Sequence, residues 1–240
     1  MDQDKLLAAC MPKIRSVEQP DFFEYAGAAG GYIDRYGYPF CRGRVFESIE
    51  MDYGQYDRKT EVFWASGACM MVRAPLFKLA GGFDEHFFAH FEEIDLCWRL
   101  KNRGYIIKVI PESRVYHFGG GTLPKSDARK TYLNFRNSLF VLYKNLPDDK
   151  LFGTIATRLL LDGISALRFL TKAEFGNFFA VFKSHLAFWT GKARYKKFRK
   201  EEKKFITRTG HKEIYQGNIV FDFFLRKKIT FQSLKWKIPV

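Results

Sequence analysis

The sequence of 240 residues is poor in the short motifs that reveal a protein's chemistry directly. Its four cysteines form no CxxC pair, which argues against a zinc knuckle or a disulfide framework. It has no GxxxxGK or GxGxxG loop and no GxSxG turn. A nucleoside-triphosphate loop, a dinucleotide-binding fold and a nucleophile-elbow hydrolase are therefore without support.

Long hydrophobic runs are missing as well. No window of about 18 residues is free of charge, so no membrane-spanning helix is predicted. The N-terminal segment MDQDKLLAACMPKI lacks the basic and apolar parts of a signal peptide. We therefore expect a cytoplasmic protein with reduced cysteines, and binding to a membrane surface stays open.

The composition is that of a folded chain whose two parts differ in charge. Hydrophobic residues make up 47% and charged residues 28%, which is enough apolar surface for a core. Residues 1–100 carry 11 Lys and Arg against 16 Asp and Glu, whereas residues 101–240 carry 29 against 10. The composition changes after Pro147, so we expect two regions, residues 1–147 and residues 148–240.

The first region has the pattern of an α/β fold with a mixed sheet. Residues 14–60 are rich in Gly, Tyr and Asp and predict loops with short strands, and the apolar run 62–73 predicts one buried strand. Pro75 and the pair Gly81–Gly82 predict a short helix between them. Acidic residues first, basic residues last and Gly104 beyond predict a helix over Glu92–Arg103. Two strands separated by Pro111 are expected to follow.

The second region predicts two apolar helices and a basic, aromatic tail. Arg158, Asp162 and Ser165 fall on one face of the first helix. The second helix places an aromatic stripe at helical spacing, formed by Phe175, Phe178, Phe179, Phe182, Leu186 and Trp189. With the basic run 192–204, this pattern favours a basic amphipathic region on anionic lipid. A helical pair that packs its stripe onto the first region explains the pattern equally well.

The densest set of groups for chemistry lies in FDEHFFAHFEEIDLCWRL. Carboxylates at a helix N-terminus stay ionised, as a general base for an alcohol requires, although acidic residues in a first helical turn also serve simply as caps. The nearby histidines do not have the spacing of HExxH or another metal template. The run Gly119–Gly121 after His117 fits close approach of a phosphate or an ordinary turn.

Five segments, taken in order, resemble the C-terminal half of a bacterial family 2 glycosyltransferase of the rhamnosyltransferase kind, which has a GT-A fold. The resemblance covers roughly residues 1–147. It implies an inverting transfer of a sugar from a nucleotide-diphosphate sugar to a hydroxyl of a cell-surface glycan or a lipid-linked acceptor. The segments are WASGACMMVR (64–73), GGFDEHFF (81–88), FEEIDLCWRLKNRGY (91–105), VIPESRVYHFGGGT (109–122) and YLNFRNSLFVLYKNLP (132–147).

The resemblance also implies roles for single residues. Glu93, preceded by Glu92, matches the base that deprotonates the acceptor, and Asp95 matches a positioning residue that can pair with Arg99. His117 matches a histidine near the metal or diphosphate, and the implied cation is Mg²⁺ or Mn²⁺. Further residues are expected to line the substrate pocket or to contact the diphosphate or acceptor: Trp64, Ser66, Gly67, Ala68, Lys130, Arg136 and Asn137. For the last three, a basic helix surface is the alternative.

The chain departs from the family in one large respect. We find neither the nucleotide-binding half nor its DxD-type motif, so the main metal ligands are expected there and this chain alone is expected to bind donor weakly. The expected location is the inner face of the bacterial plasma membrane. The alternative is a non-catalytic remnant that binds a membrane or a partner chain. A nucleic-acid partner is not expected, because the charge is confined to one region and RNP, KH and helix-turn-helix signatures are missing.

Overall fold

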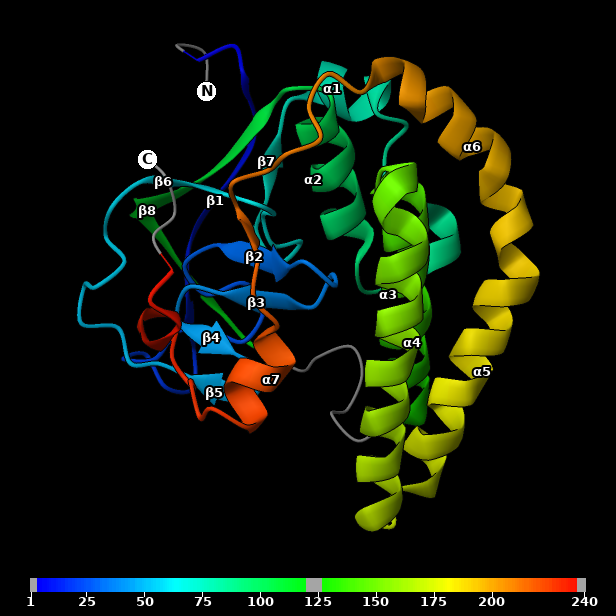
Figure 1. Ribbon diagram of the computed structural model, residues 1–240. Coiled ribbons are helices and arrows are strands. Elements are labelled where there is room, and N and C mark those ends of the chain that lie inside the picture. The colour runs from blue at the N-terminus through cyan, green and yellow to red at the C-terminus, as the bar shows by residue number, and fades with distance from the viewer. Residues whose placement is uncertain (1–3, 120–126, 237–240) are drawn as a thin grey trace.

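The computed structural model describes residues 4–119 and 127–236, which form two mixed β-sheets flanked by helices (Figure 1). The first sheet has the strand order β6-β8-β1-β7 and the second has the order β5-β4-β3-β2-β9. The expected α/β class with a mixed sheet and flanking helices is confirmed. The strands of the first sheet are β1 (Leu7–Ser16), β6 (Thr60–Val62), β7 (Met71–Val72) and β8 (Ile106–His117).

The centre of the first sheet is the parallel pair of β1 and β8. Most residues of β1 are buried, as an apolar strand covered on both faces should be. Its partners shift in register between Pro12, which faces Ile110, and Lys13, which faces Arg114. The prediction of two strands separated by Pro111 was therefore wrong. Proline lacks the N–H that a regular ladder needs, and here it lies in an irregular stretch within one long strand.

The prediction of a single strand over residues 62–73 was also wrong. The chain forms β6 on one edge of the first sheet and β7 on the other, so residues 63–70 must cross between the edges. Within this crossing, the Ser66 hydroxyl donates to the carbonyl of Ala26 and accepts from the backbone N–H of Ala68. These bonds fix a loop at a point where the apolar composition alone indicated a strand.

The second sheet combines the short strands predicted for residues 14–60 with a strand from the far end of the chain. Strand β9 pairs in parallel with β2, and the Asp34 carboxylate accepts a hydrogen bond from the backbone N–H of Ile219. Residues 214–236 are therefore part of this layer and do not form the expected basic amphipathic tail. The strands are β2 (Gly31–Asp34), β3 (Pro39–Cys41), β4 (Arg44–Val45), β5 (Ser48–Ile49) and β9 (Ile214–Tyr215).

The helices begin and end largely where their sequence signals predicted. Helix α1 (Ala74–Leu79) begins beside Pro75, and α2 (Glu92–Asn102) has the acidic first turn and basic last turn expected of it. Helix α2 packs Trp98 edge-on against Phe63, with ring centroids 5.2 Å apart. The other helical segments are η1 (Glu85–Phe87), α3 (Ala128–Asn145), α4 (Asp148–Thr171), α5 (Phe175–Gly191), η2 (Lys192–Arg194), α6 (Tyr195–Glu202), η3 (Lys203–Phe205), α7 (Ile219–Phe224) and η4 (Gln232–Leu234).

Helices α4 and α5 form a hairpin whose turn lies at the bottom of Figure 1. Arg158 and Asp162 of α4 pair at 2.9 Å in the interior, as their shared face predicted, and the hydroxyl of Tyr38 donates to Asp162 at 2.8 Å. The outer surface is different, because most of the aromatic stripe on α5 is between 49% and 65% exposed. Within the described ranges, every helix is too short or too polar to cross a membrane.

Candidate functional site

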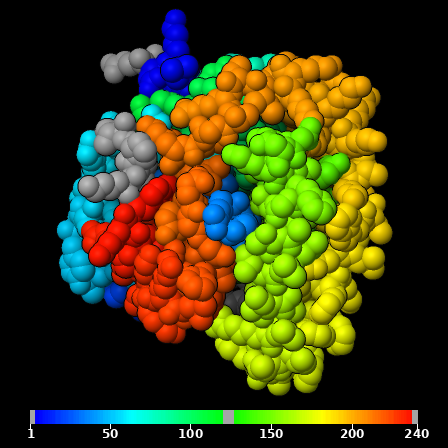
Figure 2. All heavy atoms as spheres, viewed as in Figure 1, coloured from blue at the N-terminus to red at the C-terminus, as the bar shows by residue number. Residues whose placement is uncertain are grey.

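A cavity of about 1320 Å³ lies where the second sheet meets the start of α2 and the flanks of α4 and α7. Figure 2 shows a hollow between the orange-to-red C-terminal segment and the yellow-green helix α4, with blue N-terminal side chains at its floor. Several residues predicted for the site line this cavity: Trp64, Ser66, Glu93, His117 and Lys130.

Glu93 and Glu92 open helix α2 without a salt bridge in the described part of the chain. Each has one carboxylate oxygen that is buried and has no hydrogen-bond partner among the described residues. Burial is the main cause that raises the pKa of Glu93 to about 8, and the neighbouring charge of Glu92 is the second. The raised pKa differs from the expectation that this carboxylate stays ionised, because burial opposes the helix N-terminus; Glu93 can accept a proton from a hydroxyl in the cavity once it has lost its own.

The backbone just before α2 is strained. Phe88, His90 and Phe91 all have positive φ angles, between 62° and 73°, although none of them is glycine. Burial, with the charge of Lys130 nearby, lowers the pKa of His90, which also lines the cavity. Such outliers persist only where the surroundings hold them, and they cluster at functional sites.

Helix α3 supplies the groups that hold this strained turn. The Asn137 side-chain amide donates to the carbonyls of Phe87, Ala89 and His90 at 2.8–3.0 Å. Its oxygen accepts from the guanidinium of Arg136. Asn137 is fully buried and neither residue lines the cavity, so both support the turn here, and their contact with substrate stays a prediction.

Asp95 is buried on the opposite side of α2, within a network of donors. It accepts from Arg99 at 2.9 Å, from Lys144 at 2.8 Å and from the Asn145 amide at 2.9 Å. Burial alone would raise the pKa of Asp95, but the cations Arg99 and Lys144 outweigh it and hold the pKa below its usual value. The predicted pair with Arg99 is confirmed. Asp95 holds α2 in place and does not line the cavity.

The crossing loop carries the remaining predicted residues, and Gly67 among them lies beside Glu93. The Trp64 indole donates to the carbonyl of Tyr32 at 3.0 Å and fixes the start of the loop. A Cβ atom on Gly67 would lie 4.0 Å from the Cβ of Glu93, so this glycine faces the carboxylate's side of α2. Ala68, next to it, is exposed. The close approach of Ser66 to residue 27 requires glycine there. Gly27 has a φ of +118°, and a Cβ atom on it would lie 2.4 Å from the Cβ of Ser66.

His117 pairs with an acid that sequence reasoning missed. Its Nδ1 lies 3.4 Å from a carboxylate oxygen of Glu24, which is buried and also lines the cavity. Glu24 stands in a loop, FFEYAG, without a motif around it, so the sequence carried no signal for this pair. Gly119 follows close by, whereas Gly120 and Gly121 of the predicted phosphate turn lie outside the described residues.

The residues present do not complete a site for Mg²⁺ or Mn²⁺. These cations prefer six ligands that are mostly oxygen atoms. In residues 4–119 and 127–236, no three His, Cys, Asp or Glu side chains gather closely enough to hold a metal ion, and His117 has Glu24 alone beside it. The expected metal role of His117 is therefore not supported by a ligand set.

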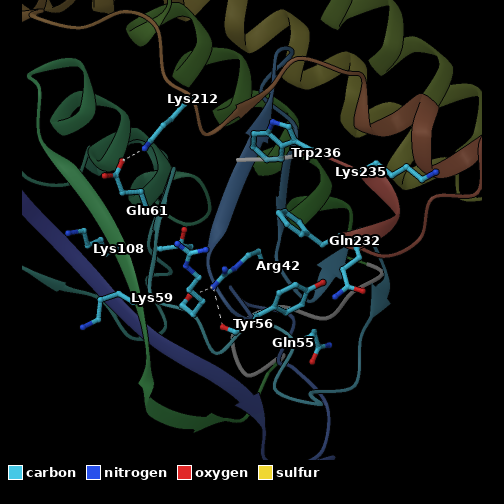
Figure 3. A pocket seen from close by; sticks show the side chains of 13 residues that line it. Arg42, Gln55, Tyr56, Lys59, Glu61, Lys108, Lys212, Gln232, Lys235 and Trp236 are labelled. Carbon is cyan, nitrogen blue, oxygen red and sulfur yellow. Dashed lines mark hydrogen bonds and ion pairs between the residues drawn. The ribbon is translucent and has the colours of Figure 1, made fainter. Parts of the chain in front are cut away.

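A second pocket, of about 820 Å³, lies at the outer edge of β6 (Figure 3). Its walls are basic: in Figure 3, Lys59, Lys108 and Lys212 lie on one side and Lys235 on the other, and Lys212 is 3.4 Å from Glu61. Arg42 in its wall donates to backbone carbonyls, including that of Tyr56 at 3.3 Å. None of the residues predicted for catalysis or substrate binding lines it, so the larger cavity is the candidate active site.

Comparison with curated proteins finds similarity to bacterial rhamnosyltransferases. The chain is 41% identical over 56 residues to N-acetylglucosaminyl-diphospho-decaprenol L-rhamnosyltransferase of Mycobacterium tuberculosis, which is 23% of this chain and 18% of the relative. It is 28% identical over 128 residues to dTDP-rhamnosyl transferase RfbF of Shigella flexneri, covering 48% and 43% of the two chains. Rhamnosyltransferase WbbL of Escherichia coli is 37% identical over 59 residues, or 25% and 22%. The matched segments span less than half the length of these relatives.

No family model matches the chain. Among solved structures, GalNAc-T7 with UDP, GalNAc and Mn²⁺ superimposes with a TM-score of 0.50 at 12% sequence identity. The match covers 99% of this chain and 37% of the other. The likeness shows the GT-A kind of fold, in agreement with the resemblance found in the sequence. Recognition of this chain as similar to family 2 glycosyltransferases is thereby confirmed.

Proposed function

We propose that this chain carries the acceptor side of an inverting glycosyltransferase of the rhamnosyltransferase kind. The observation that carries the proposal is Glu93, a carboxylate without an ion-pair partner in the described residues, which lines a large cavity beside the crossing loop. The similarity to rhamnosyltransferases supports a nucleotide-diphosphate sugar as donor and a hydroxyl of a cell-surface glycan or lipid-linked molecule as acceptor.

The proposed reaction is a single displacement. The Glu93 carboxylate takes the proton of the acceptor hydroxyl, and the hydroxyl oxygen forms a bond to the anomeric carbon. The bond from that carbon to the diphosphate breaks, and the nucleoside diphosphate leaves with the electron pair. Attack opposite the leaving group inverts the configuration at the anomeric carbon.

The other site residues bind or support in this proposal. Trp64, Ser66 and Gly67 shape the wall beside the acceptor, with Ala68 at its edge, and Lys130 offers charge to the acceptor or diphosphate. Asn137 and Arg136 act through the strained turn that positions α2. A divalent cation is the expected partner of the leaving diphosphate, but its ligand set is not complete here and no step is derived from it.

We further propose that the protein binds the inner face of the plasma membrane through α5. Its exposed stripe includes Phe179, Phe182 and Trp189, at 57%, 53% and 49% exposure. The Lys192 ammonium lies 3.9 Å from the centre of the Trp189 ring, and such a pairing of aromatic and cation suits an anionic lipid interface. The same stripe favours the second candidate function, a non-catalytic protein that docks to membranes.

The variant Glu93→Gln tests the proposal and separates the two functions. Sugar transfer to a lipid-linked acceptor should fall by about 100-fold or more, because the base is removed while the shape is kept. The exposed Glu85→Gln, in η1, is the matched control and should keep its activity. Unchanged turnover in Glu93→Gln would overturn the base assignment, whereas no transfer by the wild-type protein would favour the non-catalytic docking function.

A further inference from the structure

The candidate cavity has two chemically different ends. The end at Glu93 is polar and includes Ser66, His117 and Lys130. The other end runs between α4 and α7 and is mostly apolar, with Ser165, Arg168 and Asn218 also in its lining. We call this end the apolar groove; its apolar lining residues are Phe46, Leu161, Ile164, Val220, Phe221 and Phe224. One ligand that fills the whole cavity must therefore be polar at one end and apolar at the other.

Arg44 of β4 connects the two ends. Its guanidinium lies 4.5 Å from the centre of the Tyr25 ring, in the segment that carries Glu24 at the polar end. It also donates to the carbonyl of Phe46 at 3.2 Å, and the Phe46 ring packs on the aromatic rings of α7. Arg44 therefore lies in the cavity wall, next to both ends.

Arg44 lacks the anionic partner that a buried guanidinium requires. Its side chain is almost completely buried, and its remaining donor bond goes to the Cys41 sulfur at 3.3 Å. Its Nε is buried without a hydrogen-bond partner, and the described residues place no carboxylate within salt-bridge distance of it. Glu24 attracts Arg44 without forming an ion pair with it, so an anionic group of a ligand in the cavity fits as its direct partner.

The outer mouth of the apolar groove opens onto an apolar surface. Ile164, Phe221 and Leu225 line the cavity and remain 62%, 44% and 67% exposed. Leu160 and Leu167, on the same helix as Ile164, are exposed beside them. A hydrocarbon chain that leaves the groove here therefore continues along apolar side chains and does not enter water directly.

We infer that the apolar groove binds the hydrocarbon chain of a phosphate-linked lipid acceptor, with Arg44 contacting the phosphate and the glycosyl hydroxyl reaching Glu93. The inference rests on the proposed function, because it places the acceptor of that reaction. It adds the chemical order of the ligand along the cavity: hydroxyl, then anion, then hydrocarbon. It also explains why one cavity contains an unpaired carboxylate, an unpaired guanidinium and an apolar channel.

Binding of farnesyl diphosphate to the 240-residue protein tests the inference, measured by titration calorimetry beside inorganic diphosphate and farnesol. Farnesyl diphosphate should bind at least about tenfold more tightly than either, since each fragment fills one part of the site. Ile164→Glu, in the groove, should weaken this binding about tenfold or more. Phe152→Glu is the matched control, because Phe152 is exposed on the same helix but belongs neither to the cavity lining nor to the apolar surface at its mouth.

The Arg44 contact is tested separately. Arg44→Lys keeps the charge and favours folding, so it should weaken the binding of farnesyl diphosphate less than Arg44→Gln does. Farnesol should bind equally to the wild type and to both variants. Two results would overturn the inference: inorganic diphosphate binding as tightly as farnesyl diphosphate, or equal effects of the Ile164 and Phe152 variants. If Arg44→Gln does not fold, Arg44→Lys decides, and unchanged binding of farnesyl diphosphate would refute the phosphate contact.

This binding measurement does not depend on catalysis. If the groove variants bind the probe like the wild type while Glu93→Gln loses transfer, the groove inference fails and the proposed function stands. If the groove variants no longer bind farnesyl diphosphate while Glu93→Gln transfers sugar normally, the groove inference stands and the base assignment fails.

Discussion

Carboxylates on the two sides of helix α2 have different hydrogen-bond partners and opposite pKa shifts. On the side that packs against α3, Asp95 accepts from three donors and its pKa is lowered. On the side that faces the cavity, Glu93 has a raised pKa and a buried oxygen without a partner in the described residues. The two residues are only two positions apart, so their sequence neighbourhood is nearly the same. The difference comes from what the rest of the fold places opposite each.

The same contrast holds for two arginines elsewhere in the molecule. Arg158 of α4 pairs with Asp162 and clamps that helix to the second sheet through Tyr38. Arg44 has no such acid among the described residues and lines the cavity. Both arginines line the cavity. The paired one holds elements together, and the one without an acid partner in the described residues can meet a ligand. Perturbed groups of this second kind are the ones expected to act on a ligand.

The largest expected effect on stability follows from breaking a paired charge. Asp95→Ala leaves Arg99 and Lys144 buried without their acceptor and should lower the free energy of unfolding by about 3–5 kcal/mol. Glu93→Gln replaces a buried carboxyl group whose raised pKa favours the neutral form, so it should leave the free energy of unfolding unchanged or raise it. Urea denaturation of both variants measures the difference. Equal losses of stability would show that the two sides of α2 do not differ.

A smaller loss is expected where α3 supports the strained turn. Asn137→Ala leaves up to three carbonyls of the turn without their donor and should cost about 1–3 kcal/mol in the free energy of unfolding. Because the turn precedes Glu93, sugar transfer should fall further than stability alone explains. Thr131→Ala, on the same helix, is the control, because its hydroxyl donates to Asn177 of α5 and the residue does not line the cavity. Full activity in a folded Asn137→Ala protein would contradict the supporting role.

The fold was predictable where local signals agree with the tertiary structure. The Pro and Gly residues around α1 and the charge order of α2 marked these helices correctly, because caps act within a few residues. The prediction of one strand over residues 62–73 was wrong because apolar composition does not reveal that the chain must cross from one sheet edge to the other. The sequence also did not predict that residues 214–236 return to the second sheet. Strand β9 pairs with β2, which lies about 180 residues earlier in the chain, and local patterns do not reveal such a pairing.

The candidate site was predictable only in part. Glu93, Ser66 and Trp64 stand in recognisable segments, and the structure brings them to one cavity. Glu24 and Arg44 were missed because neither stands in a motif, and their importance lies in burial and in missing or unexpected partners. Asn137 was found, but its side chain is directed to backbone carbonyls, which no pattern of residue types indicates.

A more modest effect is expected at the exposed stripe of α5. Phe182→Glu should weaken binding to vesicles of phosphatidylglycerol and phosphatidylcholine about tenfold, because it replaces apolar insertion with a repelled charge. Leu79→Glu is the control, since it is equally exposed on α1, away from the stripe. Vesicle flotation at low and high salt measures the effect. Complete release of the wild-type protein by salt would contradict apolar insertion, because screening removes electrostatic attraction alone.

The smallest effect sharpens the comparison within the first turn of α2 itself. Sugar transfer should rise with pH through about 8, because Glu93 must lose its proton before it can act as a base. The folded state holds this proton at pH values where the unfolded chain has lost it, so Glu93 also makes folding less favourable as pH rises towards 8. Glu92→Gln removes a like charge and should move the activity profile to lower pH, with little change in the maximal rate. A profile that stays in place would mean that burial alone sets the pKa of Glu93, and that Glu92 serves only to cap the helix.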